Sequence, residues 1–129
     1  MHPSPSQALR AYGAVQATRS LREQEAEVYA TLSGRLRAAV LSGSSMDRVR
    51  ARADASRLFT ALYALVLHPS CALPEGLRGA IASVTRVALA DIEGEAPDFS
   101  FLAGICDDFA AGLRTRPVTA KTHAEAAAA

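Results

Sequence analysis

The segment from Arg57 to His68 is the most apolar part of the chain, and its pattern predicts a central helix. Wound at 100° per residue, its large apolar side chains cover an arc of roughly 200°. One supporting layer covers only about 100°. We therefore expect one of two arrangements: the chain itself covers this helix on two sides, or one side lines a groove for a partner. For any single residue, burial within the chain is the favoured interpretation. The candidate groove residues are Leu58, Phe59, Leu62, Tyr63, Val66 and Leu67.

Helical signals also fill the N-terminal third of the chain. A short first helix is expected over about residues 7–17, and Gly13 weakens it by up to about 1 kcal/mol. The segment Ser20-Leu21-Arg22-Glu23 fits a capping box, in which the Ser and Glu side chains satisfy each other's amides at a helix start. We therefore predict that a second helix begins at Ser20. Gly43 is the expected residue at its C-terminal end.

The second half of the chain predicts three more helices. The third begins at Ser45 or Asp47 and runs to about residue 67, where a following Pro ends it. Pro74 suits the first position of a fourth helix, which ends at about Gly94. Asp98 can cap a fifth helix over about residues 99–113, whose apolar residues recur at spacings of three and four.

Composition and spacing together predict an all-α fold. The 129 residues are 50% hydrophobic but only 5% aromatic, and the abundant alanine favours helices. Short connections favour a compact antiparallel bundle of about five helices. We predict a single helical domain over residues 1–116, a flexible tail over residues 117–129 and a disordered N-terminus.

Net charge does not identify a partner, since it is +1 for the whole chain. Residues 1–60 carry nine Arg against five acids, and the rest of the chain is mildly acidic. The favoured interpretation of the basic cluster is a solvated helix surface with local ion pairs. A phosphate-binding patch is the weaker alternative, because no aromatic residue is interleaved to stack bases. The cluster consists of Arg48, Arg50, Arg52 and Arg57.

No catalytic or metal-binding constellation emerges from the sequence. Cys71 and Cys106 are far apart and form no Cys-x-x-Cys motif, so we expect both to be reduced. His68 has no interior partner for catalysis, and Asp107 and Asp108 point about 100° apart on a helix. We therefore predict no enzyme activity, no metal, no cofactor and no small-molecule substrate. The N-terminus lacks a signal-peptide core and no apolar run could span a bilayer, which predicts a soluble cytoplasmic protein without a membrane partner.

The order of segments resembles the flagellar biosynthesis regulator FlaF family of alphaproteobacteria. The resemblance covers roughly residues 8–113. It rests on Arg57-Leu58-Phe59-Thr60-Ala61-Leu62, Leu73-Pro74-Glu75-Gly76-Leu77-Arg78, Ile81-Ala82-Ser83-Val84, Asp98-Phe99-Ser100-Phe101-Leu102 and Gly112-Leu113, with similar segments at Ala11-Tyr12 and Ser20 to Glu27.

This resemblance implies a non-enzymatic protein that binds flagellin, as a secretion chaperone or assembly regulator, together with the partner protein FlbT. Two alternatives stay open. One is a post-transcriptional regulator that contacts flagellin mRNA through the basic cluster, although the charge pattern does not favour direct RNA contact. The other is a helical scaffold or self-association module.

Overall fold

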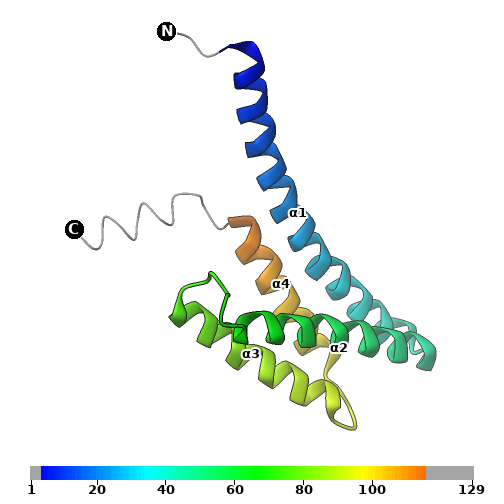
Figure 1. Cartoon of the computed structure of the whole chain (residues 1–129). Helices are drawn as coiled ribbons and strands as arrows, with labels where there is room; N and C mark the ends of the chain where they lie inside the picture. The colour runs from blue at the N-terminus through cyan, green and yellow to red at the C-terminus, as the bar shows by residue number, and fades with distance from the viewer. Residues whose placement is uncertain (1–3, 116–129) are drawn as a thin grey trace. The chain divides into compact units, whose positions relative to one another are not determined.

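The computed structural model describes residues 4–115, including their side chains except those of residues 15–20. Its helices are, in order, α1 (Pro5–Ser42), α2 (Ser45–Leu67), α3 (Glu75–Glu93) and α4 (Phe99–Thr115) (Figure 1). Residues 4–115 contain no strand, and the all-α fold class is confirmed. The predicted C-terminal tail lies outside the described residues, and so do the first three residues of the predicted N-terminal one.

One predicted boundary is wrong: the backbone is helical throughout residues 5–42, so no helix begins at Ser20. Between Gly13 and Gly34 the sequence has neither Gly nor Pro, and nothing interrupts the backbone hydrogen bonds there. The start of α1 lies earlier, at a capping box that sequence reasoning missed. Ser4 Oγ accepts from the Gln7 amide at 3.3 Å, and Gln7 Oε1 accepts from the Ser4 amide at 3.2 Å.

The turn between α1 and α2 follows the prediction. Gly43 has φ +66°, the left-handed conformation that favours glycine just after a helix. Ser44 then caps α2, since its side chain accepts from the Asp47 amide at 3.3 Å. Only two residues therefore separate the helices, and α2 extends from Ser45 to Leu67 as expected.

The later helix ends also agree with the sequence to within one or two residues. Pro74 is the residue before α3 rather than its first helical residue, and Glu75 supplies an acidic side chain in the first turn. Asp98 caps α4, because its Oδ1 accepts from the Phe101 amide at 3.0 Å. Asp91 Oδ2 in turn accepts from the Asp98 amide at 2.9 Å and fixes the connecting loop to α3.

The chain divides into two compact units, and the larger one comprises residues 31–106. It contains the end of α1, all of α2 and α3, and the first half of α4. Burying each large apolar side chain in its core contributes roughly 1.5–3 kcal/mol. The largest fully buried side chains are Phe59, Leu36, Leu102, Val66, Thr85 and Cys106.

Helices α2 and α3 form an antiparallel hairpin within the larger unit, side by side in Figure 1. Two arginines form hydrogen bonds between the helices at the ends of the hairpin. Arg52 on α2 donates from Nη2 to the carbonyl of Gly94, the C-terminal cap of α3, at 3.0 Å. Arg78 on α3 donates from Nε to the carbonyl of Val66 at 3.1 Å and from Nη2 to that of His68 at 3.4 Å, at the end of α2. Each helix therefore satisfies terminal carbonyls of the other.

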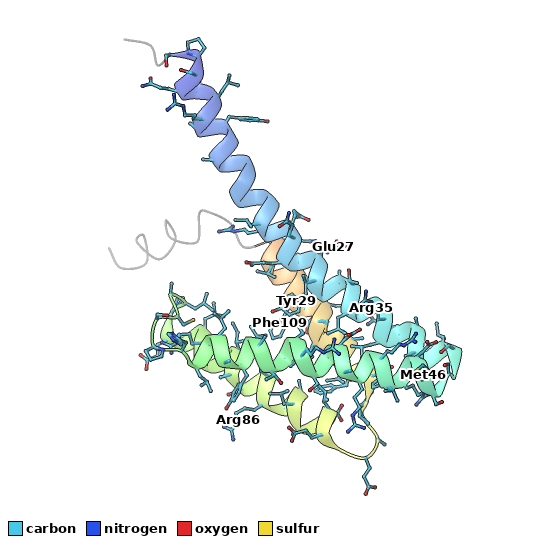
Figure 2. The ribbon with its side chains drawn as sticks, turned by 45° about the vertical axis from the view of Figure 1, so that its right-hand side comes forward. Glu27, Tyr29, Arg35, Met46, Arg86 and Phe109 are labelled. Carbon is cyan, nitrogen blue, oxygen red and sulfur yellow. The ribbon has the colours of Figure 1, made fainter. Side chains whose placement is uncertain are left out.

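The smaller unit comprises residues 1–30 and 107–129, of which the structure describes residues 4–30 and 107–115. In it, α1 and α4 run antiparallel. The Tyr29 and Phe109 rings meet edge to face with centroids 5.5 Å apart. Farther along, Arg114 lies 3.3 Å from a Glu27 carboxylate oxygen and 3.7 Å from one of Glu23. Buried Ala26 on α1 and Ala110 on α4 add apolar contact surface to this aromatic pair and these exposed ion pairs; Glu27, Tyr29 and Phe109 are labelled in Figure 2.

No disulfide joins Cys71 and Cys106. Cys106 is buried in the core of the larger unit. Cys71 is half-buried in the connection between α2 and α3.

Candidate functional site

The predicted groove does not form as one surface, because the structure separates its residues by burial. Phe59 and Val66 are 0% and 1% exposed, so they belong to the core and cannot line an open groove. Leu58, Leu62 and Tyr63 are half-buried. Leu67 is exposed and lies outside the buried face of α2. The central part of the wide apolar arc is thus covered by the chain itself, and only its margins reach solvent.

The four basic residues do not form a patch either. Arg52 is engaged at the end of α3, as described above. Arg57 lies 3.5 Å from an oxygen of Asp54, whose other oxygen lies 3.2 Å from Arg35 on α1. Arg48 and Arg50 are exposed and point to different sides of α2, because residues two apart in a helix are separated by about 200° around its axis. Arg57 fits the favoured prediction of a helix surface with local ion pairs. The positions of the four arginines do not favour a nucleic-acid interface.

An open hollow does lie along the α2–α3 hairpin, and Tyr63 is the one predicted groove residue that lines it. We call it the Tyr63 hollow. Its volume is about 570 Å³, and α3 supplies the rest of its wall. The lining residues are Tyr63, Ser83, Arg86, Val87, Leu89, Ala90 and Glu93.

Helical geometry explains why this face of α3 is open. Thr85, Ala88 and Ile92 are buried and define the core side of the helix. Val87 lies off that side at 100° per residue, and it is 56% exposed. The offset of Val87 from these buried residues is the signal in the sequence that places it on the surface. Val87, Leu89 and Ala90 thus give the hollow an apolar surface, beside the polar side chains of Ser83, Arg86 and Glu93.

A second group of exposed apolar side chains surrounds the turn between α1 and α2. Leu41 is 87% exposed at the end of α1, and Met46 and Val49 are 56% and 62% exposed at the start of α2. Arg48 and Arg50 flank Val49 in sequence. None of these three residues lines the Tyr63 hollow.

The sequence also drew attention to His68, Asp107 and Asp108 as possible chemical groups. His68 follows the last residue of α2, and its Nδ1 lies 2.6 Å from Ser70 Oγ and 3.1 Å from the Ser70 amide. Asp107 and Asp108 are exposed on α4. Across residues 4–115, no three His, Cys, Asp or Glu side chains are grouped closely enough to hold a metal ion.

Among the described residues, no helix combines the length and the apolar character that crossing a bilayer requires.

Comparison with known proteins defines the class of the molecule. Residues 8–113, which are most of the chain, match a family model described as Flagellar protein FlaF. The chain belongs to the FlaF family and is therefore a flagellar protein. A search of curated proteins found no match, and neither did a search of solved structures.

Proposed function

We propose that this FlaF-family protein is a non-enzymatic flagellar regulator that binds flagellin in the cytoplasm, as a secretion chaperone or an assembly regulator. Family membership supports the flagellar role. The observation that supports binding is the Tyr63 hollow, an open surface with apolar lining and no catalytic grouping. A protein that shields part of a client chain needs such a surface, because apolar side chains provide most of the association energy.

A co-purification experiment tests flagellin binding directly. The full chain and flagellin are co-expressed, the complex is isolated, and its affinity is measured by calorimetry. Val87→Asp places a carboxylate in the hollow, where a bound partner would desolvate it, so we expect affinity to fall about tenfold or more. Val84→Asp is the matched control, since Val84 is 39% exposed on the same helix but does not line the hollow.

The two possible failures are distinct. Absence of a complex between flagellin and the wild-type chain contradicts the function itself. A complex that tolerates Val87→Asp as well as Val84→Asp contradicts only the assignment of the binding site. Circular dichroism on both variants confirms that helix content is unchanged.

FlbT is proposed as a second partner, on the family resemblance alone. The test is a pull-down of FlbT with the wild-type chain, followed by addition of flagellin to the isolated complex. We expect FlbT to be retained on the wild-type chain. A chain that binds flagellin but captures no FlbT would contradict this partnership.

Self-association is a second candidate function, and the exposed apolar group at Leu41, Met46 and Val49 favours it. Static light scattering over a range of concentrations tests it. A mass that rises with concentration in the wild-type chain and not in Leu41→Arg would support a self-associating module. A constant monomer mass would exclude it.

A further inference from the structure

The α3 wall of the Tyr63 hollow carries opposite charges at two separated points. Arg86 and Glu93 both line the hollow and are both exposed. They are seven residues apart, so helix geometry places them about 10.5 Å apart along the axis and on nearly the same face. Val87 and Ala90 lie between them in the lining. The wall thus runs from positive through apolar to negative over two helical turns.

Neither charge is neutralised within the described part of the chain. The ion pairs of residues 4–115 involve other side chains, and the side chains of Arg86 and Glu93 make no hydrogen bond there. Figure 2 shows the Arg86 side chain extending away from the α3 ribbon. Unpaired opposite charges at the two ends of an apolar strip select a partner with the complementary charges, because complementary potentials guide association and fix its register.

We propose that the Tyr63 hollow binds an amphipathic helix of a protein partner, with one acidic and one basic side chain two turns apart beside its apolar stripe. A helix repeats the same spacing of about 10.5 Å between positions i and i+7. Its acid then faces Arg86, its base faces Glu93, and the stripe between them covers Val87 and Tyr63.

An extended segment does not meet the same requirement. At about 3.3 Å per residue it spans this distance in three residues, and side chains three apart in a strand point to opposite faces. Only one of its two charges would face α3. The spacing of Arg86 and Glu93 therefore favours a helical occupant over an extended one.

This inference rests on the proposed function, because it assigns the class of partner for the same hollow. For flagellin, it means that the segment bound here is helical.

Synthetic peptides test the inference without flagellin. Three peptides of about 18 residues, long enough to hold helical structure, share one apolar stripe. They differ only at two flanking positions, i and i+7, which carry Glu and Lys, two Glu, or two Lys. Each is titrated against the full-length chain by fluorescence anisotropy, after circular dichroism has shown equal helicity. We expect the Glu/Lys peptide to bind wild type about threefold to tenfold more tightly than the other two.

Charge reversal in the protein should change that preference in a defined way. Arg86→Glu makes both charges of the hollow negative, so the Lys/Lys peptide should become the tightest ligand. Glu93→Arg makes both positive, so the Glu/Glu peptide should become the tightest. Arg48→Glu, an exposed reversal outside the hollow, should keep the wild-type order. The preferences should vanish in about 1 M salt, where the screening length is about 3 Å.

Two results would overturn the inference: no peptide binds, or the order of affinities is the same in all four proteins. Flagellin binding is measured separately on the same proteins. If flagellin binds but the peptide order ignores Arg86 and Glu93, the helical partner is wrong and the proposed function stands. If the peptides follow the charges and flagellin does not bind, the proposed function is wrong and the helical partner class stands.

Discussion

Arg52 and Arg78 cap each other's helices: each lies near the start of one helix of the α2–α3 hairpin and donates to carbonyls at the end of the other. Both side chains are half-buried, so these charge-assisted hydrogen bonds are partly shielded from water. They fix the register of the hairpin at both ends, and through it the wall of the Tyr63 hollow.

Removing either arginine should destabilise the larger unit. Arg52→Met and Arg78→Met keep an apolar stem but leave the carbonyl oxygens without their donors, and we expect a loss of about 1–2 kcal/mol for each. Urea denaturation followed by circular dichroism measures the loss. Arg48→Met and Arg86→Met are matched controls on the same two helices and should change stability by less than about 0.5 kcal/mol. Equal effects in caps and controls would show that the capping bonds contribute nothing.

Phe59 should be a structural residue and not a contact residue. Its side chain is fully buried, so Phe59→Ala leaves a cavity and should cost about 3–5 kcal/mol of unfolding free energy. Leu67→Ala, at a residue of α2 that is 54% exposed, should cost little. A Phe59→Ala protein with wild-type stability would contradict the described core.

The left-handed turn at Gly43 gives a third prediction. Gly43→Ala introduces a Cβ at φ +66°, which should cost about 1–2 kcal/mol, although no neighbouring atom lies within 4 Å of that Cβ. Gly43→Asn should cost less, because Asn tolerates this conformation. Gly79→Ala, within α3 and equally open, should stabilise by about 0.5–1 kcal/mol. Thermal denaturation of the three variants should give opposite signs for Gly43→Ala and Gly79→Ala.

The smaller unit should depend on its aromatic contact more than on its ion pairs. Phe109→Ala removes the ring that meets Tyr29, and we expect a local loss of about 1 kcal/mol, seen as about fivefold faster amide exchange over residues 21–30. Arg114→Met should have a smaller effect, since its pairs with Glu23 and Glu27 are exposed. Phe101→Ala, 43% exposed on the same helix, is the control. Unchanged exchange in Phe109→Ala would refute the role of the contact.

Local signals made the helix ends from Gly43 onward predictable. Gly43, Pro74 and Asp98 each mark a boundary through chemistry that involves only neighbouring residues, and the structure agrees to within one or two positions. The same kind of signal misled at Ser20, because Ser-x-x-Glu also occurs inside uninterrupted helices. The true capping box, Ser4 with Gln7, was readable from the sequence but was missed.

The site was less predictable because it depends on contacts between distant residues. Arg52 looks like any surface arginine of α2, and its partner Gly94 is 42 residues away. The width of the apolar arc left open which residues of α2 the chain itself covers, and it did not indicate that Phe59 and Val66 lie inside the core. Most residues that line the hollow lie on α3. Val87 among them is exposed, although an apolar side chain alone suggests burial.

The contrast between the two thiols has a practical consequence. Cys106 is sealed in the core, whereas Cys71 is half-buried in the connection that leads into α3. In the folded protein a maleimide dye should therefore modify Cys71 alone, without any prior mutagenesis. The native chain would then carry a single fluorescent reporter at the entrance to the helix whose face lines the hollow, and engagement of a partner there could be followed in real time.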